Sequence, residues 1–222
     1  MKHDIDLGVE NAKGVLRKAL QQSKKQIIAF SGGKDAIVTA HIAAQLGIHE
    51  AVCETSFYFQ RQLDDIKKMA NILGLNVHWE NRLDLAWLRK NKRVIFSSDS
   101  KVRSWTYAER QQKTIRKFSE ANNFDCQIFG RRTEENTVKD VLYKTAAGLQ
   151  CHPIRSWSTE MVWEYMKIHN LPVPWIYSTR VAEHGGNGPF YSMQAKNYGG
   201  EEACWQIVSS LDPRYTRQNI LG

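Results

Sequence analysis

Short continuous runs of apolar residues alternate, over the first 130 residues, with segments in which apolar residues recur at helical spacing. The continuous runs are typical of strands buried on both faces, and they fall at residues 27–30, 51–55, 75–79 and 125–129. The helical spacing predicts helices at residues 9–25, 36–46, 62–73, 84–90 and 106–122. Strands that alternate with helices predict an α/β fold, with a doubly wound, mostly parallel sheet and helices on both faces.

The pattern changes after Gly130, where no further buried strand is predicted. Ser158 is a suitable N-cap for a helix that begins at Thr159, and Pro172 prevents that helix from continuing. A last helix is predicted at residues 201–211. This part of the chain therefore resembles an appended layer more than a continuation of the sheet.

We predict a core at residues 1–150 and a helical and loop extension at residues 151–222 that completes the domain. Within the extension, the glycine-rich stretch at residues 184–191 must be rich in turns. It is either a lid over a site or a plain connection, and the sequence leaves both interpretations open.

The chain has 222 residues, of which 42% are hydrophobic, enough for a sizeable buried core. No apolar run reaches the roughly 18 to 20 residues that a membrane-spanning helix needs, and the N-terminus lacks the apolar core of a signal peptide. We therefore expect a soluble protein of the cytoplasm with no membrane partner. Cys53, Cys126, Cys151 and Cys204 stand singly, so their spacing favours reduced thiols and no zinc site or iron–sulfur cluster.

The formal net charge of +8 is concentrated in one segment. Residues 89–117 hold ten lysines and arginines against only Asp99 and Glu109, so this segment alone accounts for the whole excess. A basic segment attracts polyanions, and Trp105 and Tyr107 within it are able to stack on bases. Nucleic acid bound through residues 89–117 is one interpretation, and a solvated helix face is the other.

The strand predicted at residues 27–30 runs into Ser31-Gly32-Gly33-Lys34-Asp35 and then into a helix. Two glycines leave backbone N–H groups accessible, and a helix N-terminus adds positive potential, so this loop is suited to bind phosphates. Ser31 offers a hydroxyl and Lys34 a full positive charge, whereas Asp35 is better placed to cap the helix or to help hold Mg²⁺. The loop matches neither a Walker A motif nor a dinucleotide fingerprint, and a tight turn without a ligand is the alternative.

Three stretches of the chain together resemble the phosphoadenosine phosphosulfate (PAPS) reductase family. Residues 31–35 look like the pyrophosphate loop of the adenine nucleotide alpha hydrolase-like enzymes. Gly130-Arg131-Arg132-Thr133-Glu134-Glu135 resembles the family's Gly-x-Arg-x-(Asp/Glu)-Glu motif. Residues 152–177, with His152-Pro153-Ile154-Arg155-Ser156-Trp157 and Asn170-Leu171-Pro172, are similar to its Pro-(Ile/Leu)-x-x-Trp segment. The stretches follow the family's order and span about two-thirds of the chain.

The resemblance implies an adenine nucleotide at the carboxyl ends of the strands, where a doubly wound sheet also places its ligands. It implies that residues 31–35 and Gly130 lie against this nucleotide. Glu54 and Thr55, at the end of the second predicted strand, would lie beside the nucleoside.

Arg131 and Arg132 would, by the same resemblance, approach the phosphates or a sulfate from the opposite side. Planar guanidinium groups suit this task because each grips two oxygens at once. The alternative is that both arginines form surface ion pairs with Glu134 and Glu135.

Two departures from the family's pattern bear on the chemistry. Ala36 stands where the family loop commonly has Ser or Thr, so one hydroxyl that would reach a phosphate or a metal is missing. The reductases carry a reactive cysteine in a C-terminal tail, whereas this chain has no cysteine after Cys204. Cys204 lies in a predicted helix and is better interpreted as a buried, inert thiol, so sulfonucleotide reduction lacks its nucleophile.

We therefore expect an enzyme that binds ATP with Mg²⁺, or a related adenine nucleotide, and cleaves the α–β phosphate bond to adenylylate an unidentified acceptor. Lys34, Arg131 and Arg132 would be catalytic by offsetting charge on the phosphates, and Asp35 would help to hold the metal. One alternative is a PAPS reductase or sulfur transferase that uses Cys204 or an external thiol. Another is a nucleotide- or nucleic-acid-binding module without turnover, and a homodimer is also left open.

Overall fold

The computed structural model describes residues 2–135, 139–181 and 188–222, and the chain divides into two compact units. Unit 1 consists of Met1–Cys53, Lys67–Trp79 and Ile115–Val173. Unit 2 consists of Glu54–Ile66, Glu80–Thr114 and Pro174–Gly222. Each unit is thus assembled from segments that lie far apart in the sequence.

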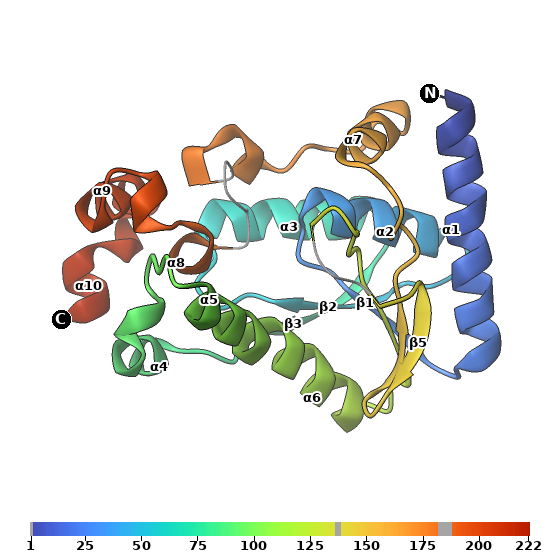
Figure 1. Cartoon of the computed structure of the whole chain (residues 1–222), viewed down its shortest axis with the longest axis horizontal. Helices are drawn as coiled ribbons and strands as arrows, with labels where there is room; N and C mark the ends of the chain where they lie inside the picture. The colour runs from blue at the N-terminus through green and yellow to red at the C-terminus, as the bar shows by residue number, and fades with distance from the viewer. Residues whose placement is uncertain (1, 136–138, 182–187) are drawn as a thin grey trace. The chain divides into compact units, whose positions relative to one another are not determined.

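A six-stranded sheet has the strand order β3-β2-β1-β4-β6-β5, and Figure 1 labels its strands β1, β2, β3 and β5. Its strands are β1 (Gln26–Ala29), β2 (Glu50–Glu54), β3 (Asn76–Glu80), β4 (Cys126–Ile128), β5 (Leu142–Thr145) and β6 (Gly148–Cys151). β1 pairs in parallel with β2 and β4, and β4 pairs in parallel with β6, while β5 and β6 form an antiparallel hairpin. The mostly parallel sheet of a doubly wound α/β fold is therefore confirmed.

The central strands are buried because their apolar runs place a hydrophobic side chain on each face of the sheet. In unit 1, Ile27 of β1 has no exposed surface and Val52 of β2 is 1% exposed. Both belong to a cluster of buried residues that also contains Ile115, Phe124 and Phe129. Burial on this scale fixes the positions at which the strands end, and the loops that follow them carry the candidate site.

The helices of unit 1 pack on this sheet and on one another. α2 (Lys34–Ala44) packs against both α1 (Lys2–Gln22) and α7 (Thr159–Ile168), as Figure 1 shows. α3 (Gln60–Ile72) connects β2 to β3 and belongs to unit 1 from Lys67 onward. α6 (Lys113–Ala121) belongs to unit 1 from Ile115 onward and contributes this residue to the buried cluster.

Unit 2 has a separate apolar core that is rich in aromatic rings, including those of Phe57, Phe96, Phe190, Trp205 and Tyr215. Its helices are α4 (Leu85–Lys90), α5 (Ser100–Tyr107), α8 (Pro189–Ser192), α9 (Glu201–Leu211) and α10 (Arg217–Leu221). Short 3₁₀ turns lie at Lys92–Val94, Trp175–Ser178, Ala195–Asn197 and Pro213–Tyr215, and a π-helical turn at Ala108–Gln112 joins α5 to α6.

Two predicted helices begin more than one helical turn earlier than expected. α1 begins at Lys2 and not at residue 9, because Ile5 is 1% exposed and extends the buried stripe of the helix. The helix predicted at residues 106–122 begins at Ser100, because the Asp99 carboxylate caps it by accepting two backbone N–H groups. One buried apolar residue extends α1, and one capping carboxylate extends α5, beyond the segments in which apolar residues recur at helical spacing.

The β5–β6 hairpin was not predicted, because β5 has no continuous apolar run and its residues are partly buried or exposed. Part of the loop predicted at residues 184–191 lies outside the described residues, but Pro189–Ser192 forms the short helix α8. The division of the chain at residue 150 stays a prediction. Within the described ranges, no helix is both long enough and apolar enough to cross a membrane.

Candidate functional site

The loop of residues 31–35 connects β1 to α2 in unit 1. Gly32 has a φ of 71°, a left-handed conformation that glycine adopts without strain, and Gly33 is the N-cap of α2 with no side-chain cap. The backbone N–H groups of the first turn of α2 have no helical partners, and they point the positive end of the helix dipole at the loop. The carboxylate of Asp35 does not cap the helix, so of its two predicted roles only metal binding stays a prediction.

Lys34 is a buried cation held between two carboxylates. Its Nζ lies 2.8 Å from Asp35 Oδ2 and 2.9 Å from Glu135 Oε1, and the residue is 8% exposed. Both carboxylates contact the same ammonium, so they converge on one point beside the loop. The sequence pattern indicated Glu135 only as an ion-pair partner of the arginines, but in the structure its carboxylate lies beside the loop together with that of Asp35.

A divalent cation fits this pair of carboxylates. Mg²⁺ in proteins is commonly bound by one or two carboxylates together with phosphate oxygens of a substrate. Asp35 and Glu135 supply such a pair, but in the part of the chain that the structure describes, this loop included, no group of three or more acidic, histidine or cysteine side chains is arranged to hold a metal. The donor set therefore suits a metal that arrives with a nucleotide and not one bound by the protein alone.

Arg132 is fully buried and makes hydrogen bonds with all three of its guanidinium nitrogens. They donate to Asp35 Oδ1 (2.6 Å), Glu134 Oε2 (2.6 Å), Glu135 Oε1 (2.6 Å), Thr159 Oγ1 (3.1 Å) and the carbonyl of Trp157 (3.1 Å). Burial alone lowers the pKa of Arg132, but the charge of Asp35 and these bonds outweigh it and raise the pKa above its ordinary value. Arg132 thus ties the loop to the start of α7 and presents no surface to a ligand.

Gly130 and Arg131 lie on the same side of unit 1 as the loop. A Cβ atom added to Gly130 would lie 2.6 Å from the carbonyl oxygen of Asp35, so only glycine fits this close approach of two backbones. Arg131 is partly exposed, and its guanidinium carbon lies 4.5 Å from the centroid of the Phe129 ring. The two arginines of the motif therefore differ, since one is part of the interior and the other faces solvent.

Glu54 and Thr55 belong to unit 2, where they make local contacts. Glu54 is 5% exposed, and its Oε2 lies 2.7 Å from Nε of Arg110, which is 2% exposed. Burial raises the pKa of Glu54 in spite of the opposing effect of the Arg110 charge. Thr55 donates its hydroxyl to the carbonyl of Glu80 at 3.1 Å. The sequence pattern placed Arg110 in the basic segment at residues 89–117, because no neighbouring residue in the sequence indicates that its side chain is buried.

The thiols of the chain are poorly suited to act as nucleophiles. All four cysteines lie among the described residues, where they are buried thiols outside any disulfide. Burial raises the pKa of the Cys204 thiol to about 11, so very little thiolate exists near neutral pH.

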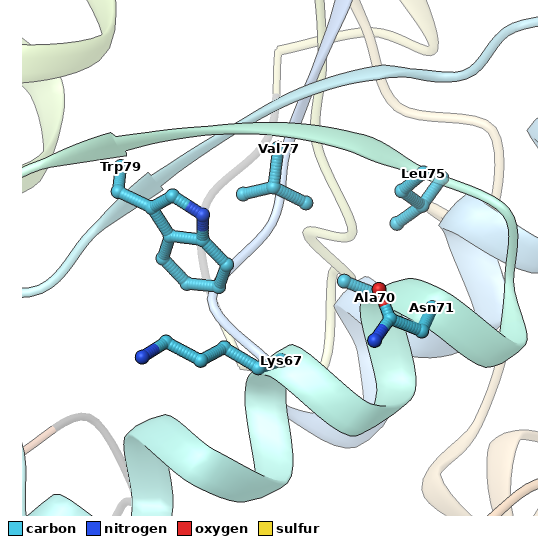
Figure 2. Close-up of a pocket in the computed structure, with 6 residues that line it drawn as sticks. All are labelled: Lys67, Ala70, Asn71, Leu75, Val77 and Trp79. Carbon is cyan, nitrogen blue, oxygen red and sulfur yellow. The ribbon is translucent and has the colours of Figure 1, made fainter.

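A shallow pocket of about 290 Å³ lies at the outer edge of the sheet in unit 1. Figure 2 shows Trp79 and Val77 on β3 facing Lys67 and Asn71 on α3 across this pocket. β2 separates β3 from β1 in the sheet, and no residue of the glycine loop lines the pocket. The phosphate loop and this pocket are therefore different features of unit 1.

The structure defines a class of protein, a doubly wound α/β domain with a glycine loop between β1 and α2. Within that class, the sequence model of the phosphoadenosine phosphosulfate reductase domain matches residues 25–191, and the chain belongs to this family. The predicted resemblance is therefore confirmed.

Similar proteins include an uncharacterized protein of Methanocaldococcus jannaschii that is 25% identical over 187 residues. The match covers 78% of this chain but only 38% of that relative, so the chain spans well under half of its length.

Three solved structures share the fold. PAPS reductase from Candida auris, in a phosphate complex, has a TM-score of 0.58 and 12% identity over 80% of this chain and 91% of that one. NH₃-dependent NAD synthetase from Campylobacter jejuni, with nitrate, has a TM-score of 0.55 and 16% identity, and the match covers 75% of this chain and 74% of that one. Yeast FAD synthetase with FAD has a TM-score of 0.50 and 14% identity, and the match covers 78% of this chain and 63% of that one. At these identities the likeness concerns the fold.

Proposed function

We propose that the chain binds ATP with Mg²⁺ at the loop of residues 31–35 and transfers the adenylyl group to an acceptor. The observation that carries this proposal is the loop itself, with a left-handed Gly32, a Gly33 cap and the N-terminus of an eleven-residue helix. Backbone N–H groups in this arrangement bind phosphate oxygens. Membership of the PAPS reductase family supports an adenine nucleotide as the class of ligand.

In the proposed reaction, an oxygen of the acceptor forms a bond to the α-phosphorus of ATP, and any proton on that oxygen passes to water. The bond between this phosphorus and the oxygen that bridges to the β-phosphate breaks, and pyrophosphate leaves with the electron pair. Ser31 and the loop N–H groups hold the leaving pyrophosphate, and Lys34 offsets its charge.

Arg131 and Arg132 take different parts in this proposal. Arg131, which is partly exposed, is the arginine that contacts phosphates. Arg132 is a positioning residue, because it holds the carboxylates of Asp35 and Glu135. Those two carboxylates would hold Mg²⁺, whose charge neutralises the phosphates when it is bound.

Contacts to the remainder of the nucleotide are proposed from the family's arrangement. Gly130, whose backbone lies against that of Asp35, would line the part of the site that holds the phosphates. Glu54 and Thr55 stay the proposed neighbours of the nucleoside.

A second candidate function, binding and reduction of PAPS, is favoured by the family match. The burial of Cys204 opposes it, because reduction needs a thiolate that attacks sulfur. An external thiol donor would remove this objection, so PAPS belongs in the first binding experiment.

The proposal is tested by a thermal-shift titration with ATP–Mg²⁺, ATP with a chelator, and PAPS, followed by a pyrophosphate-release assay with candidate acceptors. Binding to the native state raises the melting temperature with ligand concentration, so no knowledge of the acceptor is required for the first step. A larger shift with ATP–Mg²⁺ than with PAPS supports adenylyl transfer. A larger shift with PAPS supports the second candidate, and no shift with either refutes nucleotide binding at this loop.

Lys34→Met is the variant that assigns binding to the loop. It keeps the aliphatic length of the buried side chain but removes the charge, so the shift with ATP–Mg²⁺ should be lost. Lys18→Ala, which removes an exposed charge from α1, is the matched control and should leave the shift intact. A normal shift in Lys34→Met would rule out the role given to this residue.

A further inference from the structure

The basic segment at residues 89–117 does not form one uniform surface. Four of its cations make local contacts that occupy them: Arg110 with Glu54, Lys113 with Glu109, Arg116 with Glu120, and Arg89 with the carbonyls of Ile220 and Asn219. The segment is therefore less available to a polyanion than its composition suggests, and the remaining cations determine what it binds.

Lys90, Lys92, Arg93 and Lys101 are exposed, and none of them forms an ion pair with an acid among the described residues. They come from the end of α4, the following 3₁₀ turn and the start of α5, all within unit 2. The two acids between residues 84 and 105, Asp84 and Asp99, serve as N-caps of α4 and α5. This group is thus a local excess of positive charge.

A stack of planar groups lies among these cations. The Trp87 and Trp105 rings are 5.9 Å apart, centroid to centroid, with 14° between their planes, and the guanidinium carbon of Arg93 lies 5.1 Å from the Trp105 centroid. Lys90 is one helical turn after Trp87, and Lys101 is one turn before Trp105, so each lies on the same helix face as its tryptophan. Arg93 therefore contacts the stack, and Lys90 and Lys101 lie on the helix faces that carry it.

The sequence suggested that Trp105 stacks on bases, but the structure places Trp87 and Arg93 against its ring and packs it on the core of unit 2. Arg93 is the exposed member of the stack. Bases stack on arginine guanidinium planes as well as on aromatic rings, and here the tryptophans hold that plane in place.

We propose that Lys90, Lys92, Arg93 and Lys101 form a binding surface for single-stranded nucleic acid, with a base stacked on Arg93 and phosphates bound by the lysines. This surface is independent of the proposed nucleotide chemistry. It rests on one segment of unit 2, and it does not require the loop of residues 31–35.

The test is fluorescence anisotropy of the full chain with a labelled oligothymidylate of about 12 nucleotides and an abasic strand of equal phosphate count. The three lysines and the charge of Arg93, which together neutralise about four phosphates, predict a slope of log affinity against log salt of about −3, which is about a 50-fold loss between roughly 50 and 200 mM salt. Stacking predicts tighter binding of thymidylate than of the abasic strand, by at least about fivefold.

Three variants assign this binding to the surface. Lys101→Ala should reduce the magnitude of the salt slope by about 0.7, whereas Lys18→Ala on α1 should leave it unchanged. Arg93→Lys keeps the positive charge but removes the planar guanidinium group. It should therefore leave the salt slope unchanged and abolish the preference for thymidylate over the abasic strand. Lys34→Met should bind the oligonucleotide normally, which separates this surface from the nucleotide site.

Equal affinity for the two strands would overturn the role of Arg93 and leave a surface that binds only phosphates. Equal effects of Lys101→Ala and Lys18→Ala, or an affinity that does not change with salt, would overturn the surface itself.

Discussion

His152 gives a quantitative prediction about stability, because it is a buried histidine that the fold keeps neutral. It follows β6, has no exposed surface, and lies between the rings of Phe129 and Tyr143 at centroid distances of 5.5 and 5.6 Å. Neither ring nitrogen has a hydrogen-bond partner among the described residues. Burial, together with the smaller effects of the Arg131 and Arg155 charges, lowers the pKa of His152 to about 4.

The sign of the pH effect follows from proton binding. Between its unfolded pKa of about 6.5 and its folded pKa of about 4, His152 is protonated in the unfolded chain but neutral in the folded one. The folded state therefore loses stability as the pH falls through this window. The loss from this residue should be about 2 kcal/mol at pH 5 and approach about 3 kcal/mol below pH 4.

The assay is urea unfolding at about pH 7.5 and pH 5, for the natural chain and for His152→Phe. Phenylalanine keeps the stack between Phe129 and Tyr143 but does not titrate, and other histidines such as His41 are present in both proteins and cancel. At pH 7.5 the variant should be at least as stable, because no hydrogen bond of the ring is lost. At pH 5 it should gain about 2 kcal/mol relative to the natural chain, or roughly 1 M in the urea midpoint. A stability difference that is the same at both pH values would refute the reasoning.

Three further predictions concern the loop and the thiol. Gly130→Ala should destabilise the chain by about 1 to 3 kcal/mol in urea unfolding and weaken ATP–Mg²⁺ binding, because the new Cβ would meet the Asp35 carbonyl. Gly14→Ala, which has open space at the new Cβ, is the control and should change neither the stability nor the binding. Ala36→Ser restores a hydroxyl beside the loop and should tighten ATP–Mg²⁺ binding about tenfold by calorimetry, and an unchanged affinity would exclude a phosphate contact at this position. Cys204→Ser should leave any PAPS-dependent sulfite release unchanged in a colorimetric assay, and a complete loss would make the thiol a nucleophile after all.

The order of the elements was predictable because it depends on local signals. The continuous apolar runs of β1 and β4 are legible from neighbouring residues, and they were confirmed within a residue or two. The same is true of α9, which begins at residue 201 and ends at 211 as predicted. The chemistry of the glycine loop is also local, since its glycines, lysine and aspartate are consecutive.

The electrostatic surroundings of the loop were not predictable, because they depend on residues distant in the sequence. Lys34 and Glu135 are 101 positions apart, and Arg132 reaches forward to Thr159 on another element. Charge counting treats every arginine alike, yet Arg110 is buried in an ion pair whereas Arg93 is exposed. Burial of a charge is a property of the folded chain, and neither residue type nor spacing encodes it.

The balance of charge at the loop explains why a metal belongs in the proposal. Lys34 and Arg132 carry two positive charges, and they contact the three carboxylates of Asp35, Glu134 and Glu135. These side chains leave no excess positive charge for a nucleotide, so only the backbone N–H groups, Ser31 and Arg131 would oppose the repulsion between carboxylates and phosphates. A divalent cation held by Asp35 and Glu135 would turn that repulsion into attraction. ATP should therefore bind at least about tenfold more tightly with Mg²⁺ than with a chelator, and equal affinities in calorimetry would remove the metal from the loop.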